Sequence, residues 1–145
     1  LGYYAGLPVS DHLAENGRSP SRTEYYTPGS VHSLKIEHDS PLTHGLGDRL
    51  DVLFNNSPLF DLEPGAETVG VTRLGWFDTD TPLRSGWAWG QERMQGGTAL
   101  IEAKLGDGEL FLFTPRITFR SQSHAAFPLL FNGIFYGSAD DGPIF

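Results

Sequence analysis

The sequence predicts an α/β or α+β domain with a mixed β-sheet of about five or six strands and a buried C-terminal helix. Three observations support this fold class. Residues 31–37 alternate between apolar and polar side chains, as a half-buried strand does. Residues 98–104 and 109–114 are apolar runs around a Gly-Asp-Gly turn, which is typical of a hairpin. Residues 125–136 are apolar almost throughout, which favours a buried helix.

The length and composition indicate one domain. The chain has 145 residues, enough for one sizeable core, and its 18 glycines and 10 prolines favour short strands and tight turns. We expect an irregular arm over residues 1–30, a single β-rich domain over 31–137 and a tail over 138–145. Because the chain opens at Leu1 with neither an initiator methionine nor the regions of a signal peptide, we expect it to be internal to a larger precursor.

The composition also argues against several partners. A formal net charge of −8 argues against nucleic acid, whose binding depends on lysine and arginine. The longest apolar stretch, residues 127–136, is interrupted by Pro128 and Gly133 and is far shorter than the roughly 20 residues that a membrane span needs. The chain has no cysteine, which excludes disulfides, thiolate metal sites and a cysteine nucleophile. We therefore expect no nucleic-acid partner, no membrane span and no cofactor.

Several short motifs occur in an order that resembles a known family. They are Pro28-Gly29-Ser30, Pro41-Leu42 with Gly45, Ser85-Gly86-Trp87 with Gly90, Gly106-Asp107-Gly108, and RITFRSQSHAAFPLLFNGIFY at residues 116–136. Over residues 28–137 the chain resembles the class I glutamine amidotransferase-like domain at the C-terminus of some bacterial carboxypeptidase A-like zinc peptidases. The resemblance implies a flavodoxin-like sheet with flanking helices, whose opening and nucleophile-bearing strands would lie upstream of Leu1.

The resemblance implies a role without catalysis. No cysteine is present to act as the glutaminase nucleophile, and Asp107 replaces the lysine that the family commonly has between two glycines. We expect no carboxypeptidase activity from these residues either. The implied function is a non-catalytic accessory or interaction domain of a larger secreted hydrolase, periplasmic or extracellular. Its implied partner is the upstream peptidase domain of the same precursor.

A polar group before the predicted helix is one candidate binding site. Its members are Arg116, Arg120, Gln122 and His124. Two guanidinium groups beside an imidazole can hold a carboxylate through charge-assisted, bidentate hydrogen bonds. The structural alternative is that the arginines pair with carboxylates such as Glu102 or Asp61 and fix the loop against the sheet. Both interpretations stay open on the sequence alone.

Aromatic side chains are a second candidate site. The relevant residues are Tyr25, Tyr26, Trp76, Trp87 and Trp89. Flat amphipathic rings stack on a sugar or a peptide at low entropic cost, and Trp87 and Trp89 share a face if their segment is extended. The alternative is that these rings fill a small β-rich core. As a binding site, they make a carbohydrate- or peptide-binding module the alternative to a purely accessory function.

A metal site is a third hypothesis. His38, Asp39 and His44 place two imidazoles and a carboxylate close together in sequence, and with His124 they would make a metal-assisted hydrolase. The alternative is an ordinary turn at Pro41. No Gly-x-Ser-x-Gly motif occurs, which argues against a serine hydrolase. We therefore assign no catalytic residue and no metal ligand.

Overall fold

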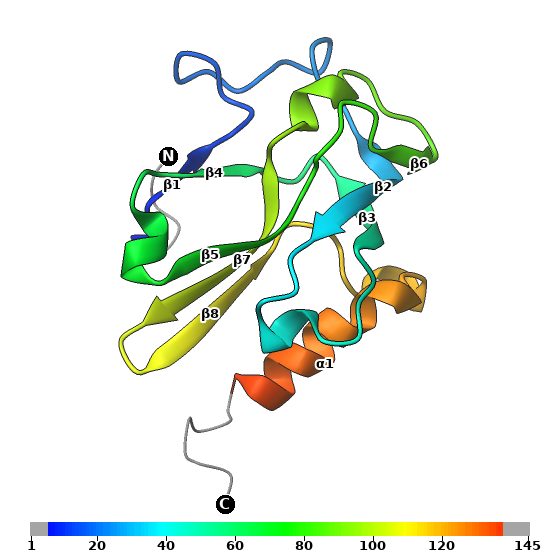
Figure 1. The fold of residues 1–145 in the computed structure, drawn as a ribbon. Helices are drawn as coiled ribbons and strands as arrows, with labels where there is room; N and C mark the ends of the chain where they lie inside the picture. Colours follow the sequence, from blue (N-terminus) through cyan, green and yellow to red (C-terminus); the bar gives the residue numbers. More distant parts are fainter. Residues whose placement is uncertain (1–5, 138–145) are drawn as a thin grey trace, which may run out of the picture.

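The computed structural model describes residues 6–137, whose strands form one antiparallel sheet (Figure 1). The strands are β1 (Val9–Asp11), β2 (Pro28–Ile36), β3 (Arg49–Asn55), β4 (Phe60–Leu62), β5 (Val71–Trp76), β6 (Leu83–Ser85), β7 (Thr98–Leu105) and β8 (Gly108–Phe113). Their order is β1-β4-β7-β5-β2-β3, with β6 paired to β2 and β8 to β7. The helical elements are η1 (Pro41–Thr43), η2 (Ala66–Val69), η3 (Gln91–Met94), η4 (Phe119–Ser121), η5 (His124–Ala126) and α1 (Phe127–Tyr136).

The predicted fold class is wrong. The sheet has eight strands and every strand pair is antiparallel, so it is neither mixed nor limited to five or six strands. A flavodoxin-like arrangement is also excluded, because parallel neighbours need helical crossovers, whereas the one α-helix of residues 6–137 follows the last strand. The prediction missed β1 and β6, which have three residues each and are too short to show an alternation.

The sheet is organised around β7, which is buried on both faces. β7 pairs with β5 along one side and with β4 and β8 along the other. Leu100 lies in the larger hydrophobic cluster, together with Leu129 of α1. Ile101 and Ala103 lie in a second cluster, together with Phe60 of β4. Successive residues of β7 therefore serve two cores, one on each face of the sheet.

The predicted hairpin between β7 and β8 is confirmed. Leu105 pairs with Gly108, so the turn consists of Gly106 and Asp107. Gly106 has a φ of +63°, whereas Asp107 is not among the residues with positive φ. A positive φ at the first central residue alone is the pattern of a type II′ turn, in which glycine is preferred.

The chain ends its described part in a helix, but this helix is only partly buried. α1 buries Leu129, and Asn132 donates hydrogen bonds to the carbonyl oxygens of Leu42 and His44, each at 2.9 Å. The opposite side exposes Phe131, Ile134 and Phe135. The prediction of a buried helix is therefore wrong for one side of α1. None of the helices within residues 6–137 is long and apolar enough to cross a membrane.

β2 carries a histidine in the core. The side chain of His32 is fully buried between the edges of Phe54 and Phe77, with ring centroids 6.1 and 6.0 Å away. Its Nε2 lies 2.8 Å from the Ser30 hydroxyl, and its Nδ1 has no hydrogen-bond partner among the described residues. Because water cannot solvate a proton here, burial lowers the pKa of His32 to about 4.

The buried histidine makes stability depend on pH. The unfolded chain binds a proton as the pH falls through 6.5, whereas folded His32 does so only near pH 4. Stability present above pH 6.5 is thus lost progressively between these values, by about 3 kcal/mol in total. We expect urea unfolding at pH 7.5, 6 and 5 to show this fall. His32→Gln, whose amide still reaches Ser30 but does not titrate, should flatten the profile; an unchanged slope in this variant would contradict the assignment.

Candidate functional site

Tyr26, Trp87 and Trp89 form what we call the aromatic surface. Trp87 and Trp89 are each 55% exposed, and they flank the half-buried Ala88, as in an extended segment. The rings of Tyr26 and Trp87 meet edge to face, with centroids 6.0 Å apart. This geometry is one that aromatic pairs prefer, so each ring helps to orient the other.

The backbones of Tyr26 and Trp89 pair as an isolated antiparallel bridge. The N–H of each residue donates to the carbonyl of the other at 2.9 Å. Directly opposite residues in such a pair project their side chains to the same side, which places Trp89 beside Tyr26. Gly90 allows this close approach, because a Cβ there would collide with the carbonyl oxygen of Glu24 and its φ is +69°.

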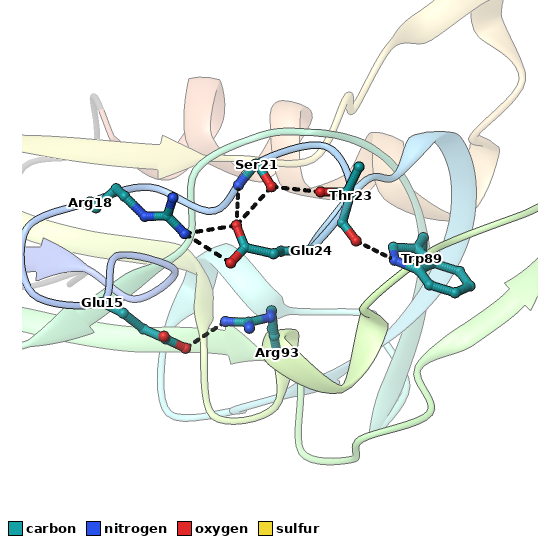
Figure 2. Close-up of polar contacts among 7 residues, drawn as sticks. All are labelled: Glu15, Arg18, Ser21, Thr23, Glu24, Trp89 and Arg93. Atoms are coloured by element: carbon teal, nitrogen blue, oxygen red, sulfur yellow. Dashed lines mark hydrogen bonds and ion pairs between the residues drawn. The ribbon is translucent and has the colours of Figure 1, made fainter.

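A polar network holds the arm segment, residues 12–26, next to Trp89 (Figure 2). The Glu24 carboxylate accepts two hydrogen bonds from Arg18, at 2.8 and 2.9 Å, and two from the N–H and hydroxyl of Ser21. The Ser21 bonds, the backbone bond first, lower the pKa of Glu24 below its usual value. The indole N–H of Trp89 donates to the Thr23 carbonyl at 2.7 Å. The ring orientation of Trp89 therefore depends on the arm segment.

A second bond ties the arm segment to η3. The guanidinium of Arg93 donates to the carboxylate of Glu15, a contact visible below the Glu24 network in Figure 2. Arg93 belongs to η3, which begins directly after Gly90. The arm segment is thus fixed to η3 at Glu15 and to Trp89 at Thr23.

A cavity of about 360 Å³ adjoins the aromatic surface. Polar or aromatic members of its lining are Asp11, Ser19, Arg22, Tyr25, Tyr26, Asn56 and Ser57. Tyr26 belongs both to this lining and to the aromatic surface, so the two are continuous. The guanidinium of Arg22 lies 5.6 Å from the centre of the Tyr26 ring, which is within cation–π range.

The cavity wall is held in a defined geometry. Asn56, whose φ is +46°, accepts a hydrogen bond from the Thr27 N–H at 2.7 Å and donates its own N–H to the Thr27 hydroxyl at 3.0 Å. Burial raises the pKa of Tyr25 in the same wall to about 12, so its phenol stays protonated at neutral pH. The lining therefore combines a carboxylate, a guanidinium, an amide, hydroxyls and a ring face, which suits a ligand with many hydrogen-bonding groups.

The predicted polar group near the helix is an exposed patch in the structure. Arg116, Arg120, Gln122 and His124 all lie at the surface. The two guanidinium groups lie 5.3 and 5.1 Å from the Phe119 ring centre, and the His124 ring lies 5.2 Å from that of Phe127. Arg120 has a φ of +51°. The two arginines and His124 thus contact neighbouring rings, and none of the four residues lines the four cavities found among residues 6–137.

The carboxylates proposed as partners of these arginines have other partners. Asp61 lies 2.7 Å from the Nδ1 atom of His12, and Glu102 accepts a hydrogen bond from the Ser40 hydroxyl at 3.1 Å. Burial raises the pKa of Glu102, which also lines a cavity of about 480 Å³ between the β7–β8 hairpin, η1 and α1.

The residues weighed as metal ligands, to which we assigned no metal, have separate partners. His38 lies 3.2 Å from an oxygen of Asp48, and the ring of His44 packs edge to face against Tyr136. His12 and Glu15 stand three residues apart, the spacing of a paired zinc ligand set, yet each contacts a different partner, Asp61 and Arg93 respectively. Among residues 6–137, no group of three or more histidines and carboxylates is placed to hold a metal ion.

The other predicted aromatic residues have separate positions. Tyr25 is buried and lines the cavity. Trp76, the last residue of β5, pairs with Lys35 near the C-terminal end of β2, whereas the aromatic surface lies near the N-terminal end of β2. The Trp76 ring is covered by Arg73 at 4.0 Å and by Lys35 at 5.3 Å. Arg22 was not predicted as part of the site, because the arm shows no periodic pattern; the Tyr25-Tyr26 pair was the available signal.

Comparison with known proteins identifies no relative. No protein-family model, no curated protein and no solved structure matches the chain. The resemblance to a peptidase-associated domain therefore stays a prediction from the motifs.

The Glu24 network should control the order of the arm segment. Glu24→Ala removes the acceptor for Arg18 and Ser21, so the chain around Thr23 loses its anchor and Trp89 its hydrogen bond. We expect severalfold faster amide hydrogen exchange over residues 15–24 and a red-shifted tryptophan emission. Asp80→Ala, which removes an exposed carboxylate elsewhere, is the control. Equal exchange in the two variants would show that the network does not hold the arm segment.

Proposed function

We propose that this chain is a non-catalytic accessory domain that binds a carbohydrate through the aromatic surface and the adjoining cavity. The observation that carries the proposal is that two tryptophans are 55% exposed yet held in place, Trp89 by its bonds to Thr23 and Tyr26, and Trp87 by the Tyr26 ring. Large aromatic side chains contribute most to stability when buried. Exposed rings with fixed positions therefore favour a binding role.

A carbohydrate suits this surface for two reasons. A sugar ring presents an apolar C–H face that can stack on an indole, and its hydroxyl groups can pair with the polar lining of the cavity. The lining offers both donors and acceptors, among them Arg22, Asp11 and Asn56. The formal charge of −8 favours a neutral saccharide over an anionic one.

A peptide is the second candidate. Proline-rich peptides in the extended polyproline conformation dock onto aromatic-lined grooves, and the edge-to-face pair of Tyr26 and Trp87 supplies such rings. The polar lining of the cavity favours the saccharide, because a proline-rich segment has no backbone N–H at its prolines and few groups to satisfy that lining.

The accessory part of the proposal comes from the motifs. The resemblance implies that the domain lies beside a secreted hydrolase, where a bound saccharide would bring that enzyme to its substrate or to a surface. The peptidase domain of the same precursor is the partner that the resemblance implies. Both the parent enzyme and its export remain predictions.

Tryptophan fluorescence tests the saccharide site directly. We expect a saturable change in emission with at least one of four neutral probes, cellohexaose, xylohexaose, hexa-N-acetylchitohexaose and maltohexaose. Trp87→Ala should weaken binding by about fivefold, because one stacking contact contributes about 1 kcal/mol. Trp89→Phe, which keeps a ring but loses the bond to Thr23, should weaken it less. Trp76→Ala is the matched control, because Trp76 lies at the other end of β2.

The outcomes separate the candidates. No response to any of the four probes, or an equal loss in Trp76→Ala, would contradict the saccharide site. If a polyproline decapeptide binds and the saccharides do not, and if Trp87→Ala loses that binding, the aromatic surface is a peptide-binding site.

A further inference from the structure

The sheet has an open edge at β8. Within residues 6–137, β8 pairs only with β7, and Figure 1 shows it at the margin of the sheet. The two-residue turn makes Leu105 and Gly108 a hydrogen-bonded pair, and such pairs recur at every second residue. Thr114, whose N–H donates to Ala99, continues this alternation beyond the strand. The backbone groups that point away from β7 are therefore those of Glu109, Phe111 and Phe113.

The other outer strands have the features that usually block strand addition. β1 and β6 have three residues each. β3 carries Arg49 and Asp51 at its surface, and the Arg116 N–H already occupies the Leu53 carbonyl at 2.8 Å. β8 has six residues, contains no proline, and pairs with β7 without a bulge. Short length, charge, proline and bulges are how sheets protect their edges, and β8 has one such feature, the exposed Glu109 at its hairpin end, so it is the least protected outer strand among residues 6–137.

The side chains of β8 extend the two cores to this edge. Phe111 and Phe113 pack against the larger cluster, and Leu110 and Leu112 against the second. All four remain only partly buried. An added strand would therefore gain three backbone pairs and would also complete the burial of apolar side chains on both faces.

We infer that β8 binds one extended segment of a different polypeptide, by strand addition at its outer edge. The charge distribution indicates the chemistry of that segment. Glu109 and Asp107 stand at the hairpin end of the edge, and the chain carries a formal charge of −8, which opposes pairing with a second copy. The segment is apolar at alternate positions and carries a basic residue beside Glu109. This site is independent of the proposed saccharide site.

A peptide with the sequence of β7, Thr98–Leu105, is a suitable probe. In the register that β7 itself uses, its lysine lies opposite Glu109. We expect the acetylated and amidated peptide to slow amide hydrogen exchange at Glu109, Phe111 and Phe113 by about tenfold or more, because these N–H groups become bonded. The N–H groups of Leu110 and Leu112, already directed at β7, should change little. Unchanged exchange at the three outward amides would overturn the inference.

Two variants at one position complete the test. Glu109→Pro removes an outward N–H without taking a bond from the β7 ladder, so peptide binding should fall at least tenfold. Glu109→Ala keeps the N–H and should lose only the charge contact. Cooperative urea unfolding reports whether each variant is folded. Equal peptide binding by the two variants would overturn the inference, as would a concentration-dependent dimer in sedimentation that Glu109→Pro abolishes.

Discussion

The burial of β7 on both faces is the constraint on which the rest of the structure depends. A strand with one wet face needs apolar residues only at every second position, whereas β7 places Leu100 in one cluster and Ile101 and Ala103 in the other. Each cluster is closed by segments from distant parts of the sequence, α1 on one face and β1 with β4 on the other. The arm segment is attached to this framework at β1, which pairs with β4.

The candidate site is held mainly by contacts to the backbone. The Tyr26–Trp89 bridge, the Trp89–Thr23 bond and the Asn56–Thr27 pair all use main-chain groups. Main-chain groups are present whatever side chain a position carries, apart from the N–H that proline lacks. The surface thus gains its shape from the path of the chain, while the side chains that face outward supply its chemistry.

The sequence predicted local features well and long-range ones poorly. The β7–β8 hairpin was predictable because its turn chemistry and its two strands are adjacent in sequence. The antiparallel order of the sheet was not, because β1 pairs with β4 and β2 with β6 across long separations that leave no local pattern. The resemblance, which rested on motif order, brought in a parallel fold that the chain does not adopt.

For the site, residue type was informative and sequence proximity was misleading. Trp87 and Trp89 were identified from their chemistry, and the structure exposes both. The group from Arg116 to His124 was chosen because its members are close in sequence, but its guanidinium groups lie over Phe119. Tyr26 was also named for its ring, but its backbone pairing with Trp89 and its ring contact with Trp87 could not be inferred from spacing along the chain.

Different residues set the shape of the aromatic surface and supply its chemistry. The recorded contacts of Arg22 and Trp87 are to the Tyr26 ring, whereas Glu24, Asn56 and Gly90 hold the path of the chain. Under the proposed function, substitutions at Arg22 and Trp87 are expected to change ligand binding at little cost to folding. Substitutions at Glu24, Asn56 and Gly90 are expected to destabilise the chain path while leaving the binding side chains in place. Selection can then change specificity through one set of positions while the scaffold stays fixed by another.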